Sequence, residues 1–221
     1  MNSQLKEFTT TAARPLPIII LADTSGSMGS EGKIDNLNQA ISEMLDSFAN
    51  EDNLRAEINV AIITFGGTVG LHTDFMPASK AKLQWREMSA NGGTPMGGAM
   101  ELAAKVIEDK SVITGRAYLP TVILVSDGQP TDSWQTGLDQ LTKQGRAQKA
   151  DRMALAIGAD ADVGMLQSFL GNSENKVFKV DDARRIKDFF RFVTMSVTAR
   201  TRSANPNDVP KMGDPFGLDQ L

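Results

Sequence analysis

Asp23, Ser25 and Ser27 place one carboxylate and two hydroxyls at alternate positions of a single short stretch. If the chain curls there, all three side chains face one point. Oxygen ligands of this kind suit a hard cation rather than zinc or copper. The chemistry predicted is therefore a divalent cation site, with Mg²⁺ as the first choice and Mn²⁺ or Ca²⁺ as alternatives.

Other uses of this stretch have to be compared with the metal site. A phosphoryl-aspartate nucleophile of the haloacid dehalogenase type has a second Asp two residues after the first, and here that position is Ser25. A phosphate-binding P-loop ends in Gly-Lys-Ser/Thr, whereas no lysine occurs in this loop before Lys33. Helix capping by Asp23 and the serines remains an alternative when these residues are considered alone.

The elements around this stretch predict where it lies in the fold. The apolar run 16–22 before it is typical of a strand buried on both faces. From Lys33 to about Ala49, apolar residues recur at three- and four-residue steps, which predicts an amphipathic helix. Asp23 then stands at the carboxyl end of a strand, where open α/β sheets bind their ligands.

A second aspartate has the same setting. The run 121–126 predicts another buried strand, and Asp127 and Gly128 follow it directly. An unpaired carboxylate at a buried strand end is costly. Separate hydrogen-bonded caps would explain Asp23 and Asp127 one at a time, whereas one shared cation explains both.

A glycine-rich loop at 91–98 surrounds Thr94 with four glycines and precedes an apolar helix. Gly98 and Ala99 stand where a P-loop needs Lys and Ser/Thr, so the loop does not indicate nucleotide binding. Glycines allow close backbone approach and unusual dihedral angles. We interpret the loop as functional, with a plain flexible loop as the alternative.

Strands and helices alternate along the rest of the chain. This order predicts an α/β, doubly wound, mostly parallel central sheet with helices on both faces. Gly66 and Gly67 join two strand-like runs, 57–65 and 68–73, and predict one antiparallel edge strand. Further helices are expected at 79–88, 136–149, 163–170 and 183–198, and further strands at 153–157 and 177–180. Asp160 and Asp162 are secondary metal candidates, and a helix N-cap is the preferred role.

The predicted domain covers residues 15–200, with tails at 1–14 and 201–221. The basic residues of the last helix are expected to form a solvated face; they are Arg184, Arg185, Lys187, Arg191, Arg200 and Arg202. This helix is expected to pack through a stripe that includes Phe189.

Composition narrows the function classes. The chain has 221 residues, a net charge of −4 and a pI of about 5.1, so no overall basic field attracts nucleic acid or an anionic membrane. It has no cysteine and a single histidine, which excludes thiolate and histidine-cluster metal sites. Residues 1–14 lack an apolar signal core, and no run approaches the roughly 20 apolar residues of a membrane helix. We expect a soluble, cytoplasmic protein.

Together, the DxSxS stretch, Thr94 in its glycine-rich loop and Asp127-Gly128 after an apolar strand resemble the von Willebrand factor A (VWA) domain with its metal-ion-dependent adhesion site (MIDAS). The resemblance covers roughly residues 17–198. It implies that Ser25 and Ser27 ligate the metal directly, that Asp23 and Asp127 bind directly or through water, and that Thr94 ligates in the ligand-bound state.

Within that family, the ADTSGSM stretch and the NGGTPMGGAM loop are similar to bacterial TerY-type proteins linked to tellurite resistance and stress response. That resemblance implies a non-enzymatic adaptor that works beside a protein kinase and a phosphatase and binds an Asp or Glu of its partner through the metal. Two alternatives remain open. They are a metal-dependent hydrolase or phosphatase, and a metal that only stabilises the three loops.

Overall fold

The computed structural model describes residues 13–51, 55–171, 176–209 and 215–220. Its centre is a seven-stranded sheet in the order β3-β2-β1-β4-β5-β6-β7. The strands are β1 Arg14–Asp23, β2 Ala56–Gly66, β3 Thr68–Pro77, β4 Thr121–Ser126, β5 Asp151–Ile157, β6 Phe178–Val180 and β7 Asp219–Gln220. Strands β2, β1, β4, β5 and β6 pair in parallel, and β3 pairs antiparallel with β2. The predicted α/β class is thereby confirmed.

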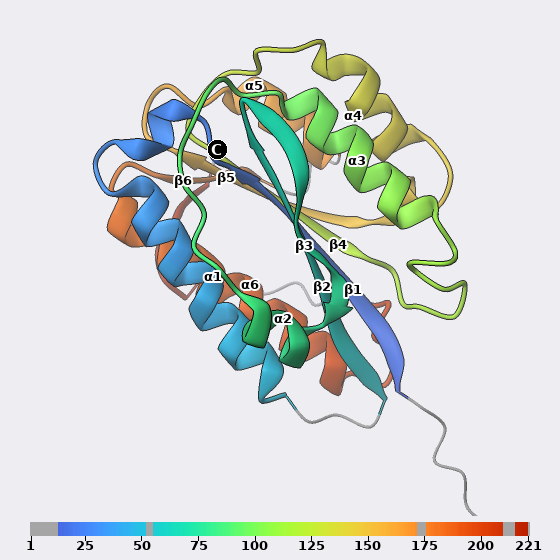
Figure 1. Cartoon of the computed structure of the whole chain (residues 1–221). Coiled ribbons are helices and arrows are strands. Elements are labelled where there is room, and N and C mark those ends of the chain that lie inside the picture. Colours follow the sequence, from blue (N-terminus) through green and yellow to red (C-terminus); the bar gives the residue numbers. More distant parts are fainter. Residues whose placement is uncertain (1–12, 52–54, 172–175, 210–214, 221) are drawn as a thin grey trace, which may run out of the picture.

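The helices form a layer on each face of the sheet. They are α1 Lys33–Ala49, α2 Ala78–Gln84, α3 Met96–Glu108, α4 Trp134–Lys143, α5 Val163–Leu170 and α6 Ile186–Arg202. Helices α1, α2 and α6 cover one face, and α3, α4 and α5 cover the other (Figure 1). The central strands β1 and β4 are therefore buried on both sides over most of their length, which is why residues 16–22 and 122–125 are apolar.

Successive residues of β1 point into different cores. Ile18 and Ile20 pack with α1 and α6, whereas Ile19 and Leu21 pack with α3. All four side chains are fully buried. This central position holds the end of β1 in place, and with it the first residue of the candidate site.

Three predicted helices differ from the structure. The helix expected at 183–198 corresponds to α6, Ile186–Arg202, which follows a 3₁₀ turn at Ala183–Arg185. The expected helix 136–149 is interrupted: α4 ends at Lys143, Gly145 has a φ of 54°, and Ala147–Lys149 form a separate 3₁₀ turn. A left-handed residue cannot continue a right-handed helix. The expected helix 79–88 ends at Gln84, because Trp85 is extended, with a ψ of 133°.

The predicted solvated face of the last helix is wrong at Arg200, which is fully buried. Its guanidinium donates hydrogen bonds to Thr121 Oγ1 at 2.6 Å, Leu119 O at 2.7 Å and Pro206 O at 2.8 Å. A buried guanidinium needs several acceptors to offset its desolvation, and these are supplied by segments distant in sequence. Arg200 therefore ties α6 to the start of β4.

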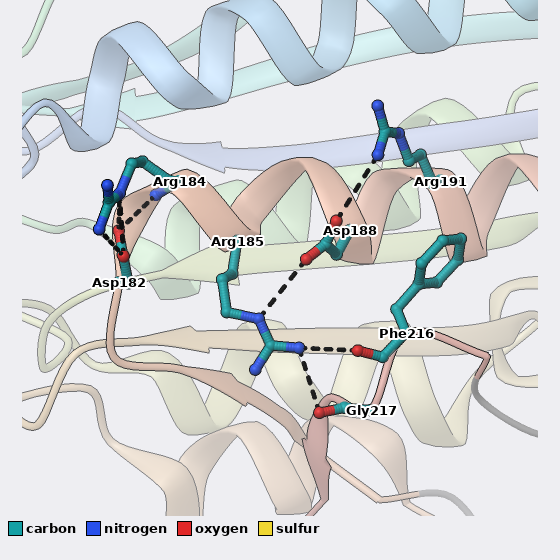
Figure 2. A network of polar contacts seen from close by, with 7 residues as sticks. All are labelled: Asp182, Arg184, Arg185, Asp188, Arg191, Phe216 and Gly217. Atoms are coloured by element: carbon teal, nitrogen blue, oxygen red, sulfur yellow. Dashed lines mark hydrogen bonds and ion pairs between the residues drawn. The ribbon is translucent and has the colours of Figure 1, made fainter.

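Residues of the expected C-terminal tail also contact the domain. Strand β7 pairs antiparallel with β6 and adds a second antiparallel strand at the other edge of the sheet. Arg185 donates hydrogen bonds to the carbonyls of Phe216 at 2.8 Å and Gly217 at 3.1 Å, and its Nε lies 3.5 Å from Asp188 (Figure 2). Among the described residues, no helix is long and apolar enough to cross a bilayer.

Candidate metal centre

Asp23 is the last residue of β1, and its side chain is fully buried. One carboxylate oxygen, Oδ1, accepts a hydrogen bond from the backbone N–H of Ser25 at 2.8 Å. The other, Oδ2, accepts from the hydroxyl of Ser126, the last residue of the neighbouring strand β4. The orientation of the carboxylate is therefore set by both strands.

Ser25, Ser27 and Asp127 form a chain of polar contacts beside Asp23. The hydroxyl oxygens of Ser25 and Ser27 are 3.0 Å apart, and Ser27 Oγ donates to Asp127 Oδ1 at 2.7 Å. Ser25 and Asp127 are almost fully buried, whereas Ser27 is exposed. The loop of Ser25 and Ser27 and the loop of Asp127 therefore meet at the carboxyl edge of the sheet, although Ser27 and Asp127 are 100 positions apart in sequence.

The glycine-rich loop that carries Thr94 is held against the other loops by backbone hydrogen bonds. Gly26 N–H donates to Gly92 O, and Gly67 N–H donates to Gly93 O, both at 2.8 Å. Gly92 has a φ of 69°, and a Cβ there would lie 2.5 Å from the Cα of Gly67. Only glycine fits such a close backbone approach in the left-handed region.

The loop that follows Asp127 holds the other side of the Thr94 segment. Thr131 N–H donates to Thr94 O, and Thr94 N–H donates to Thr131 Oγ1, both at 2.9 Å. Asp132 accepts hydrogen bonds from the N–H groups of Gly97 and Gly98 at 2.9 Å each, at the start of α3. The carboxylate of Asp132 thereby satisfies two free donors of that helix end.

Thr94 and Ser27 both point toward Gly128. A Cβ on Gly128 would lie 3.8 Å from Thr94 Oγ1 and 3.9 Å from Ser27 Oγ. Within the described part of the chain, the hydrogen bonds of Thr94 use its backbone N–H and C=O. Its hydroxyl therefore stays available to a ligand, as the predicted role of Thr94 requires.

Burial dominates the electrostatics of Asp23. Loss of solvent raises the pKa of its carboxyl above the ordinary value, and the hydrogen bonds from Ser126 and Ser25 lower it in part. The negative charge of Asp127 raises that pKa further. A carboxylate whose charged form is disfavoured in this way gains from a cation beside it.

The residues present fit a hard divalent cation. Two carboxylates and three hydroxyls supply oxygen donors only, and the described residues contain no group of three or more His, Cys, Asp and Glu that would form a different kind of centre. Neighbouring ligands of an octahedral Mg²⁺, each about 2.1 Å from the ion, lie about 3 Å apart. The contacts Ser25–Ser27 and Ser27–Asp127, at 3.0 and 2.7 Å, already have this spacing.

An open cleft of about 610 Å³ leads to these residues along the carboxyl ends of β4, β5 and β6. Ser27, Asp127 and Gly128 are among the residues that line it. Glu31, Asp160, Asp181 and Lys33 are among the charged residues that line it. Asp160 is exposed there, and Asp162 accepts a hydrogen bond from Met165 N–H at the start of α5, so the preferred capping role of Asp162 is confirmed.

Sequence reasoning did not identify three residues of this centre. Lys33 Nζ contacts Asp127 Oδ2 at 2.9 Å, Ser126 orients Asp23, and Asp132 holds the start of α3. The position of Lys33, as the first basic residue after the DxSxS stretch, was the one available signal. No spacing rule connects Asp132 with Gly97 and Gly98, because these contacts depend on how two loops cross.

The chain belongs to the von Willebrand factor type A domain family, whose model matches residues 18–192. Comparison with curated protein sequences finds no match. Similar solved structures support the same fold. A von Willebrand factor type A protein from Catenulispora acidiphila has 18% identity and a TM-score of 0.65, over 84% of this chain and 43% of its own.

Proximal thread matrix protein 1 from the mussel byssus, in a structure with a zinc-occupied MIDAS motif, has 16% identity and a TM-score of 0.66. The similarity covers 85% of this chain and 48% of the mussel protein. The conserved hypothetical protein BatB from Bacteroides thetaiotaomicron has 16% identity and a TM-score of 0.63, over 85% of this chain and 100% of its own. This chain thus spans less than half the length of the mussel and Catenulispora proteins.

Proposed function

We propose that this protein is a metal-dependent protein–protein interaction module. A divalent cation, Mg²⁺ in the first place, is held by Asp23, Ser25, Ser27, Thr94 and Asp127. An Asp or Glu of a partner protein completes the coordination. The observation that carries this proposal is that three separate loops bring two buried carboxylates and three hydroxyls to one edge of the sheet, where Ser27 and Asp127 line an open cleft.

The protein's own residues prepare this binding. Ser126 and the backbone of Ser25 keep the Asp23 carboxylate oriented, and Ser27 orients Asp127. The backbone hydrogen bonds of the Thr94 loop hold its hydroxyl at the same edge before any partner arrives. When bound, the cation supplies an electrophilic centre that accepts a carboxylate oxygen, and preorganised groups lose little entropy in making that contact.

Two of the similar structures support a binding role by analogy with their own proteins. The mussel protein's MIDAS motif holds zinc, and another similar structure is that of a pilus adhesin, SpaC from Lactobacillus rhamnosus GG, with 16% identity and a TM-score of 0.68. For this chain we place the module in residues 15–200. We propose an adaptor role of the TerY type in stress or tellurite resistance, with a kinase or phosphatase as partner.

A capture experiment tests the proposal. Wild type, Asp23→Ala and Asp160→Ala are used as bait in native cell extract, each with Mg²⁺ and with EDTA. Asp160 is the matched control because it is an exposed aspartate on the same cleft but outside the proposed ligand set. We expect capture by wild type and Asp160→Ala with Mg²⁺, and none by Asp23→Ala or with EDTA.

Capture that persists in EDTA and in Asp23→Ala would overturn the metal-bridged module. Metal-dependent melting without metal-dependent capture would instead identify a structural metal. A phosphatase assay with Mg²⁺ or Mn²⁺ on the same three proteins addresses the hydrolase alternative, which predicts turnover that is lost in Asp23→Ala.

A further inference from the structure

Lys33 forms the ion pair that reaches into the candidate metal centre. Its ammonium lies 2.9 Å from Asp127 Oδ2, while Ser27 Oγ occupies the other oxygen, Oδ1. The side chain of Asp127 is 0% exposed and that of Lys33 is 13% exposed. Both partners are therefore largely removed from water, where an ion pair is screened far less than at the surface.

The position of Lys33 is not explained by helix formation. It is the first residue of α1, after Gly32 in the left-handed conformation. A positive side chain is disfavoured at a helix N-terminus, since the partial charge there is also positive. The contact with Asp127 supplies the compensating interaction, which links the start of α1 to the end of β4 across 94 residues of sequence.

Charge balance gives this contact a consequence for metal binding. Without a metal, the negative charges of Asp23 and Asp127 repel each other, and the ammonium of Lys33 neutralises that of Asp127. A divalent cation that binds the Asp127 carboxylate encounters the positive charge of Lys33, which already contacts Oδ2 of that carboxylate. A cation and an ammonium group bound to the same carboxylate repel each other strongly in a partly desolvated site.

We propose that Lys33 is the internal counter-ion of Asp127 and competes with the divalent cation, which displaces the ammonium from Oδ2 on binding. This inference rests on the metal-binding function proposed above. Lys33 stabilises the metal-free protein and lowers its affinity for metal. It therefore raises the Mg²⁺ concentration at which the site fills, and with it the concentration at which a partner is captured.

The test uses Lys33→Met, which keeps the apolar stem and removes the charge. Lys80→Met is the matched control, because it makes the same change at an exposed lysine of α2. Calorimetric titration with Mg²⁺ alone measures the affinity of the full chain, and thermal melting in EDTA measures the stability of the metal-free protein. Lys33→Gln, which keeps a hydrogen-bond donor for Asp127, replaces Lys33→Met if that variant does not fold.

We expect Lys33→Met to bind Mg²⁺ about tenfold or more tightly than wild type, since it loses a charge-assisted contact that metal has to break. Its Tm in EDTA falls below that of wild type, and saturating Mg²⁺ raises its Tm by more than it raises the wild-type Tm. Lys80→Met matches wild type in both measurements. Mg²⁺ binding by Lys33→Met alone, with none by wild type, also supports the competition.

Two results overturn the inference, and they are distinguishable. If wild type binds Mg²⁺ and Lys33→Met binds it with equal or lower affinity, the competition is refuted while the proposed function stands. If neither protein binds Mg²⁺, the metal centre itself is refuted, and the competition with it.

Discussion

Asp132 gives the sharpest test of how the Thr94 loop is held. Its two carboxylate oxygens accept the N–H groups of Gly97 and Gly98 at 2.9 Å each, and its charge lies at the N-terminus of α3. Hydrogen bonds to a charged group contribute about 1.5–3 kcal/mol each, and the helix dipole adds about 0.3–1 kcal/mol. Because Asp132 is only partly buried and both bonds share one carboxylate, we expect Asp132→Ala to cost about 2–3 kcal/mol in total.

For a domain of this size, each kcal/mol lowers the Tm by about 2–4 °C, so thermal melting should show a fall of roughly 4–12 °C. Asp132→Asn keeps one oxygen acceptor and should fall between wild type and Asp132→Ala. The matched control is Asp139→Ala in α4, whose side chain pairs with Lys143 at 2.7 Å on the exposed surface. Exposed pairs of this spacing contribute less than about 0.5 kcal/mol.

Metal affinity is the second readout of the same variants. The loss of Asp132 frees the start of α3, which begins two residues after Thr94. Mg²⁺ affinity should therefore fall in Asp132→Ala and stay unchanged in Asp139→Ala. A Tm for Asp132→Ala within about 1 °C of that of Asp139→Ala, well below the expected fall, would refute the reasoning, since the two hydrogen bonds would then add no stability.

Three further outcomes are expected. Phe189→Ala removes a fully buried ring that packs at a tilt against Phe178, and should cost about 3–5 kcal/mol in the free energy of unfolding measured with urea. Gly92→Ala should lower both the Tm and the Mg²⁺ affinity, because its Cβ would lie 2.5 Å from Gly67 at a φ of 69°; an unchanged Tm would contradict the described loop contact. The hydrogen bonds from Arg184 hold the pKa of Asp182 at about 2, below the ordinary value of 3.8. The small stabilising effect of the Asp182 carboxylate is therefore present above pH 3.8 and is lost as the pH falls through about 2. In Arg184→Ala, an NMR titration should show that pKa rise toward 3.8, and no rise would refute the assigned cause.

Most of the fold followed from local patterns. The strand at 121–126 and the helices at 33–49 and 163–170 have the predicted bounds, because period and end signals lie within each segment. The hairpin at Gly66 and Gly67 also followed from its turn residues. The helix expected at 136–149 failed because Gly145 was not recognised as a break, although glycine is the residue that adopts a positive φ.

The burial of Arg200 could not be predicted from local sequence patterns. Six basic residues on one helix predict a solvated face, yet Arg200 is buried against Thr121, Leu119 and Pro206. No sequence signal around Arg200 predicts that these groups accept its hydrogen bonds. Burial of a charge depends on partners that only the folded chain brings together.

The sequence by itself determined the α/β class, the three loops of the site and the oxygen chemistry of Asp23, Ser25, Ser27, Thr94 and Asp127 as an expectation. It did so because strand ends and residue types are local properties of the chain. The tertiary structure decided the contacts between loops, from the Ser27–Asp127 hydrogen bond to the support by Asp132. It also decided that Lys33 faces Asp127 rather than solvent. Such contacts join residues about 35 to 100 positions apart, and their geometry arises only when parallel strands align their carboxyl ends.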